Sequence, residues 1–148
     1  MMRLILLSIA FLFSLVATSQ EEIDWVTIDS PHDVAESEKG HPFVFANEVE
    51  AGFTTENSGS LTTYSDGTFI WRLGITSAKA KSLHVTVAAS MSVGEIFSVS
   101  SVDGSNLQTY DYSNFSSKNT LMTLPVDGDS IIIEYRSFSD ADCNFCVT

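Results

Sequence analysis

The side chains that could serve as nucleophile, base or metal ligand are few in this sequence, and none is spaced for catalysis. A hydrolase triad needs a serine activated by a histidine, which a carboxylate in turn orients. The three histidines are His32, His41 and His84, and neither a G-x-S-x-G nor a G-D-S-G-G string occurs. His84 alternates with Leu83 and Val85, which places it on the solvent side of a strand. We therefore expect no catalytic residue and no enzyme activity in this chain.

Carboxylates beside glycines form the second group with chemical potential. Asp127-Gly128-Asp129 could give oxygen ligands to a calcium ion, because hard cations prefer oxygen. Aspartate and glycine are also the residues that a tight turn requires, and the EF-hand spacing is absent. Asp66-Gly67 and Asp103-Gly104 repeat the same turn signal. The sequence favours turns at all three positions, so we expect no metal ion and no cofactor.

The two cysteines, Cys143 and Cys146, lie near the end of the sequence in a C-x-x-C arrangement. In an oxidising compartment they could form a disulfide with each other, or each could pair with a cysteine outside this chain. A redox site would need a helix start beside a βαβ unit, and a zinc site would need two further ligands. Because neither is evident, we interpret them as structural thiols in a tail at residues 139–148.

Aromatic side chains and a sequon mark a candidate recognition surface. Tyr64, Tyr110, Tyr112 and Phe115 could line a face that binds a sugar, or they could pack in the core, because aromatic residues favour strands. Both interpretations remain open at this point. An N-F-S sequon begins at Asn114, in a polar stretch that we expect to be an exposed loop. Asn114 is therefore a candidate N-glycosylation site, if the source cell glycosylates secreted proteins.

The first 19 residues have the pattern of a signal peptide. Arg3 supplies a positive start, residues 4–17 are apolar except for two serines, and Ala17-Thr18-Ser19 offers small residues before Gln20. This apolar run is shorter than the about 20 residues that a membrane-spanning helix needs. We expect cleavage after residue 19, secretion of the remaining chain, and no membrane contact afterwards.

Net charge narrows the classes of partner. All 19 acidic side chains and six of the seven basic ones lie in residues 20–148, which gives that part a net charge of −13. Such a field repels nucleic acid and anionic lipid, so we expect neither as a partner. Removing 19 of the 148 residues leaves 129, enough for one domain with a two-layer core.

Alternating apolar residues predict the strands that would hold these groups in place. The pattern is clearest at 68–76, 82–90 and 130–137, where apolar residues at every second position give each strand one core-facing side. Trp71 is the expected centre of that core. The predicted core residues are Phe69, Trp71, Leu73, Ile75, Leu83, Val85, Val87, Ile131, Ile133 and Tyr135.

Short strands with D-G turns and no helical stripe predict an all-β chain. We expect an antiparallel β-sandwich of jelly-roll-like type over residues 42–138. Residues 20–41 are acidic and poorly patterned, with Pro31 and Gly40 as breakers, and we expect a leader that partly drapes on this domain. The shorter predicted strands cover residues 42–46, 61–64, 95–102, 107–112 and 121–126.

Five strings along the chain stand in a recognisable order. They are N-S-G-S at 57–60, D-G-T-F-I-W-R-L-G-I at 66–75, A-K-S-L-H-V at 80–85, G-E-I-F-S-V at 94–99 and L-P-V-D-G-D-S-I-I-I-E-Y at 124–135. In this order they resemble the non-catalytic N-terminal domain of lysyl endopeptidase-like, trypsin-family secreted serine proteases, over about residues 42–136. The sequence departs from that family where A-K-A at 78–80 replaces its P-G-A turn, and in its middle strand.

The resemblance implies an accessory β-sandwich, since no catalytic residue of the family has a counterpart here. Such a domain can aid the folding of a protease, shield its cleft or bind its targets. The chain stops at Thr148, about where the protease domain would begin. We therefore expect either a truncated protease chain, whose downstream domain would complete the framework of Cys143 and Cys146, or a domain kept alone. The alternative is a stand-alone secreted module that binds a surface glycan or protein through Tyr-rich edges.

Overall fold

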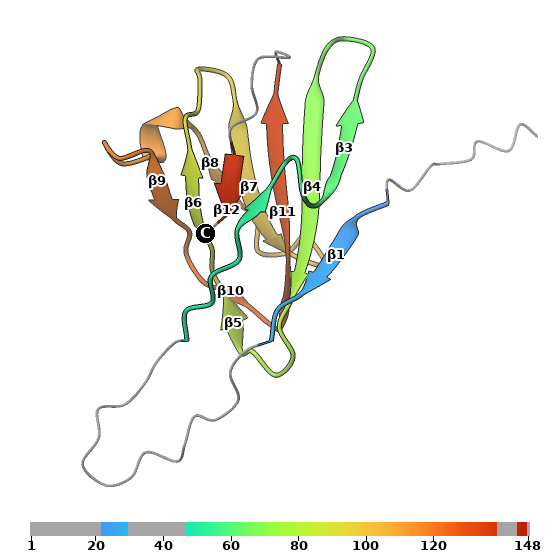
Figure 1. Cartoon of the computed structure of the whole chain (residues 1–148), viewed down its shortest axis with the longest axis vertical. Helices are drawn as coiled ribbons and strands as arrows, with labels where there is room; N and C mark the ends of the chain where they lie inside the picture. The colour runs from blue at the N-terminus through green and yellow to red at the C-terminus, as the bar shows by residue number, and fades with distance from the viewer. Residues whose placement is uncertain (1–21, 30–46, 139–144, 148) are drawn as a thin grey trace, which may run out of the picture.

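The computed structural model describes residues 22–29, 47–138 and 145–147 (Figure 1). The predicted signal peptide, the predicted strand at 42–46, most of the acidic leader, and Cys143 lie outside these ranges. Within them the chain is nearly all β, as predicted. No helix in the described part is long and apolar enough to cross a membrane.

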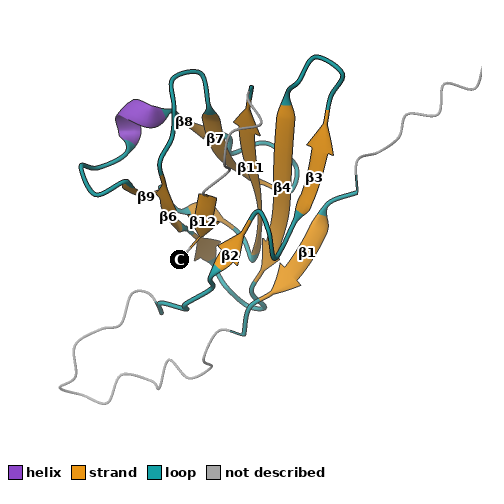
Figure 2. Ribbon diagram, turned by 45° about the horizontal axis from the view of Figure 1, so that its top comes forward, coloured by secondary structure: helices purple, strands orange, loops and turns teal. Residues whose placement is uncertain are grey.

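Twelve strands and one short 3-10 helix make up the described chain, and Figure 2 shows how little of it is helical. In chain order the elements are β1 (Asp24–Thr27), β2 (Phe53–Thr54), β3 (Ser60–Thr63), β4 (Phe69–Thr76), β5 (Ser82–Leu83), β6 (Thr86–Ala89), β7 (Ile96–Ser101), β8 (Gln108–Tyr110), η1 (Tyr112–Asn114), β9 (Thr120–Met122), β10 (Val126–Asp127), β11 (Ser130–Ser137) and β12 (Phe145–Val147).

The larger sheet has the strand order β1-β4-β11-β7-β8, with β3 also paired to β4. At its centre β4 and β11 pair antiparallel over their full lengths, with Trp71 opposite Tyr135 and Leu73 opposite Ile133. These side chains alternate with outward-facing ones, which is why the pattern was readable in the sequence.

Two strands share the outer edge of β4, placed end to end (Figure 1). β3 pairs antiparallel with Phe69–Arg72, and β1 pairs in parallel with Leu73–Thr76. The expectation of an antiparallel architecture was therefore wrong for this larger sheet, which is mixed. The physical reason is that β1 comes from a distant segment rather than from a hairpin, so no tight turn forces the antiparallel direction.

A second sheet has the order β2-β12-β6-β9, and a third consists of β10 and β5 alone. All pairs in both of these sheets are antiparallel. The buried core cluster draws on all three sheets, and mostly on the larger and the four-stranded one. Its members are Trp71, Leu73, Ile75, Val85, Val87, Ala89, Phe97, Val99, Leu121, Val126, Ile131, Ile133, Tyr135 and Val147.

Eight of the ten predicted core residues are in this cluster, and Trp71 is fully buried within it. Phe69 and Leu83 are only half-buried. Phe69 begins β4 at the end of the sheet, and Leu83 lies on the two-residue strand β5. At both places fewer neighbours are available to cover the side chain.

The strands predicted at 82–90 and 121–126 are each divided in two, at the same point in space. β5 pairs with β10, whereas β6 pairs with β9. Between the two pairings, the Thr123 hydroxyl accepts a hydrogen bond from the Val85 amide at 3.0 Å, and the Thr123 amide donates to the Val85 carbonyl at 3.0 Å. Where the strands change partner, the Thr123 hydroxyl therefore replaces a backbone carbonyl as the acceptor of one hydrogen bond between the strands.

Candidate functional site

The groups that could do acid–base chemistry lie apart. His84 is exposed between β5 and β6, as expected, whereas His32 and His41 lie outside the described residues. In the ranges that the structure describes, no three side chains from histidine, cysteine, aspartate and glutamate approach closely enough to hold a metal ion. The described residues therefore contain no cluster of side chains that could hold a metal ion.

The aspartates of the predicted turns hold those turns in place. Hydrogen bonds from the Ser101 hydroxyl, and from the Ser105 amide and hydroxyl, lower the pKa of Asp103 to about 2. The Thr68 amide, 2.9 Å from Asp66 Oδ1, lowers the pKa of Asp66 in the same way. Gly67 and Gly104 follow with φ of 85° and 73°, which glycine adopts without strain.

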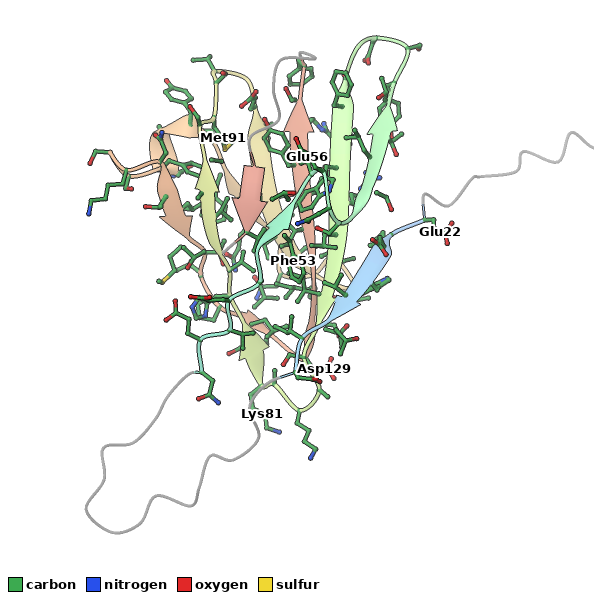
Figure 3. All side chains as sticks on the ribbon, in the orientation of Figure 1. Glu22, Phe53, Glu56, Lys81, Met91 and Asp129 are labelled. Carbon is green, nitrogen blue, oxygen red and sulfur yellow. The ribbon has the colours of Figure 1, made fainter. Side chains whose placement is uncertain are left out.

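The third of these turns joins β10 to β11. Gly128 has a φ of 112°, and its amide donates to the Lys81 carbonyl at 2.8 Å. Asp129 Oδ1 accepts from the Ser130 hydroxyl at 2.9 Å, and its carbonyl accepts from the Ser77 amide. Figure 3 shows Lys81 and Asp129 at the same end of the molecule. The polar groups here join neighbouring turns to one another, which favours the turn interpretation.

One carboxylate is buried, and the sequence analysis did not single it out. Glu95 is 7% exposed just before β7. It accepts hydrogen bonds from the Ser92 amide at 2.7 Å and from the Ser137 hydroxyl at 3.2 Å. The G-E string before an alternating strand marks a turn, but nothing local reveals that Ser137, 42 positions later, covers it. This pairing fastens the β6–β7 turn to the end of β11.

The four aromatic residues proposed for sugar binding do not form one face. Tyr110 stacks on Phe97 with ring centroids 6.0 Å apart, and Phe115 packs against the core. Tyr64 follows β3 and Tyr112 follows β8, at opposite edges of the larger sheet. Packing therefore accounts for two of the four, and the half-exposed Tyr112 is left as a single exposed ring beside β8.

Tyr110 also closes a hydrogen-bonded link between β8 and the segment that joins β9 to β10. Its hydroxyl donates to Gln108 Oε1 at 2.6 Å. The Leu124 amide donates to that same Oε1 and to the Tyr110 hydroxyl, both at 3.1 Å. Such a network holds Tyr110 in place, so a substitution there disturbs the fold as well as any surface.

Asn114 lies exposed at the end of η1. Its Oδ1 accepts from the Asp111 amide at 2.8 Å, while Asp111 Oδ1 accepts from the Ser113 amide at 2.9 Å. This reciprocal capping box fixes the single helical turn. Exposure is consistent with the sequon, and modification of Asn114 stays a prediction.

The segment assigned to a cysteine tail contains a strand. β12 lies between β2 and β6, with Cys146 in register with Thr54 on one side and Ala88 on the other. Val147 is 2% exposed and belongs to the core. The disulfide between Cys143 and Cys146 stays a prediction, because Cys143 lies outside the described residues. Residues 145–147 are thus part of the four-stranded sheet.

Two tryptophans and two glycines make close contacts along the edge of β4. The Trp71 indole donates to the Ser58 carbonyl at 2.7 Å, and the Gly59 amide donates to Asp24 Oδ2 at 3.1 Å. Any Cβ on Gly59 would lie 2.5 Å from the Trp71 indole nitrogen. A Cβ on Gly74 would overlap the Trp25 ring. Two glycines therefore make room for two tryptophans where β1 meets β3.

On the outer face, the two central strands carry an ion pair. Arg72 Nε lies 2.8 Å from Glu134 Oε2, and Arg136 lies 3.5 Å from the other carboxylate oxygen. Arg72 and Glu134 are directly opposite each other in the β4–β11 register. The pair is partly exposed, so its contribution to stability is modest.

Comparisons of this chain with protein-family models, with curated proteins and with solved structures found no match. The resemblance described above therefore depends on the residues that carry it and on how they are arranged.

Proposed function

We propose that this protein is a secreted, non-catalytic β-sandwich domain of the accessory kind that precedes lysyl endopeptidase-like serine proteases. In this proposal the larger and the four-stranded sheet stack face to face, in a jelly-roll-like arrangement. Support comes from the core cluster, which takes Trp71 and Phe97 from one sheet and Val87 and Leu121 from the other. The predicted signal peptide and acidic charge are the grounds for secretion.

The observation that carries the proposal is the pairing of the two most specific strings. W-R-L-x-I falls on β4, and the I-x-I-E-Y part of the second string falls on β11. They lie about sixty positions apart, yet they pair residue by residue, with Arg72 opposite Glu134. Two strings that form one structural unit are what a common fold would retain, whereas unrelated chance matches need not be neighbours.

A peptidase assay on the purified, exported protein tests the absence of catalysis. Lysyl and general peptide substrates should be hydrolysed no faster than in buffer. Hydrolysis that disappears when one of the chain's own serines is replaced would refute the proposal. The matched control is Ser98→Ala, which removes one serine hydroxyl at a half-buried position of β7 and should leave the background rate unchanged.

A binding assay tests the accessory role itself. The exported protein is titrated with the catalytic domain of a lysyl endopeptidase-like protease, and binding is followed by calorimetry. Saturable binding heat would support the role. It should be accompanied by a change in the rate at which the protease recovers activity after dilution from denaturant when the exported protein is added. Neither heat nor any change in recovery would contradict it.

The alternative function is a stand-alone module that binds a glycan or a protein. The observation in its favour is that the half-exposed Tyr112 is held on a single helical turn by the Asp111–Asn114 capping box. Glycan-array or pull-down signal should then be lost in Tyr112→Ala and kept in Tyr64→Ala, which removes an exposed tyrosine at the opposite sheet edge. Equal signal from both variants would exclude this site.

A further inference from the structure

The edge of β4 from Leu73 to Thr76 is paired with one short segment, β1, and we call this strand edge the groove. β1 runs parallel to Leu73–Thr76, and the Ile28 amide extends the ladder by donating to the Thr76 carbonyl at 2.8 Å. At the other end, Asp24 Oδ2 accepts from the Gly59 amide at 3.1 Å. The segment is thus held by backbone pairing along its length and by one side-chain hydrogen bond at its start.

The side chains of β1 also contribute to its pairing with this groove. Val26 and Ile28 pack against the core cluster, while Trp25 lies over Gly74 on the other face. Trp25 remains 44% exposed. The glycine is required by this contact and not by its backbone, since Gly74 has no positive φ. The groove therefore selects a strand in which an aromatic residue directly precedes two core-facing aliphatic residues at alternate positions, here Val26 and Ile28.

The segment is joined to the rest of the domain by a long stretch of chain. Between Ile28 and Phe53 there are 24 residues, which can span at most about 80 Å when fully extended. The groove needs only the few residues from Asp24 to Ile28. The connection is therefore long enough for the segment to reach the same groove on a neighbouring molecule.

We propose that the groove along β4 accepts residues 24–28 of a second copy of this chain, so that two copies exchange β1. The contacts made in the exchanged form are the same as within one chain, so protein concentration decides between the two states. The net charge of −12 opposes association, and added salt weakens that repulsion. Exchange is therefore favoured by high protein concentration and high salt.

Two variants with complementary defects test this directly. Val26→Asp places a charge on the core-facing side of β1 and leaves its own groove empty, while Gly74→Val fills the groove and frees an intact β1. Mixed together, the pair should form a complex of one copy of each by native mass spectrometry. Its affinity should exceed the self-association of either variant by about tenfold or more.

The matched control is Thr27→Asp, which adds the same charge at the exposed neighbouring position of β1. This variant should keep its own strand in place and form no such complex with Gly74→Val. If Val26→Asp and Gly74→Val remain separate monomers while circular dichroism shows both folded, the proposal is wrong.

If either variant does not fold, the wild-type protein is titrated with a labelled peptide of residues 22–29 at high salt. Saturable binding that is lost when the peptide carries Trp25→Asp supports the groove as a site that binds in trans. No binding at millimolar peptide overturns it.

Discussion

The central pair β4–β11 differs from the segments β1 and β12 in what makes each of them a strand. β4 and β11 each have eight residues and pair along their full length. β1 has four residues and β12 has three, and each joins strands that are distant in sequence. In β4 and β11, apolar residues at every second position are enough to determine a strand. The two short segments become strands only by pairing with the edge of a strand that is already formed. We therefore expect stability to be concentrated in the pair and recognition at the edges.

The largest effect is expected from Trp71→Ala. The side chain is fully buried, and its indole donates to the Ser58 carbonyl at 2.7 Å. Removing it should lower the free energy of unfolding by about 3–5 kcal/mol. Urea denaturation followed by circular dichroism measures this. A loss below about 1 kcal/mol would show that the central pair is not the main source of stability.

Val147→Ala tests whether β12 is part of the core. Val147 is 2% exposed and in register with Val87, so its loss should cost about 1–3 kcal/mol. Met122→Ala serves as the control, because Met122 is 66% exposed on β9 of the same sheet and should change stability by less than about 0.5 kcal/mol. Equal effects in the two variants would show that β12 does not contribute to the core.

A double-mutant cycle tests the contact between Trp25 and Gly74. Gly74→Ala alone should cost about 1–3 kcal/mol, since the added methyl group collides with the Trp25 ring. In a Trp25→Ala background the same change should cost little, which gives a coupling energy of about 0.5–3 kcal/mol. Additive effects in urea denaturation would mean that the two residues do not interact.

The smallest effect concerns the β7–β8 turn and depends on pH. The folded pKa of Asp103 is about 2, below its ordinary 3.8, so its ionised form stabilises the fold above that ordinary value. This contribution is lost as pH falls through about 2. Asp103→Asn should therefore be less stable than wild type at neutral pH, with a difference that shrinks toward pH 2. A difference that is constant with pH would contradict the lowered pKa.

Much of the fold was predictable because its main strands are amphipathic. Leu73, Ile75, Ile131 and Ile133 lie at every second position, and the structure buries them all. The division of the strands at Val85 and Thr123 was not predictable, since it depends on one hydroxyl replacing a ladder bond across 38 positions.

The short end segments escaped prediction for a related physical reason. Val26 and Ile28 do alternate, but two apolar residues in an acidic stretch are too few to identify a strand. The partner edge and the glycine beneath Trp25 lie about fifty positions away. For the candidate site, the sequence correctly placed His84 on the surface, but it could not reveal that Tyr110 is held by Gln108 and Phe97.

Amide hydrogen exchange followed by NMR compares the two regions within one molecule. The account predicts that amides of β4 and β11 exchange only on global unfolding, whereas the Ile28 amide, bonded to the Thr76 carbonyl, exchanges through a separate opening of lower free energy. If the Ile28 amide were protected as strongly as the central pair, β1 would be an integral part of the fold, and its release to a second copy would be contradicted.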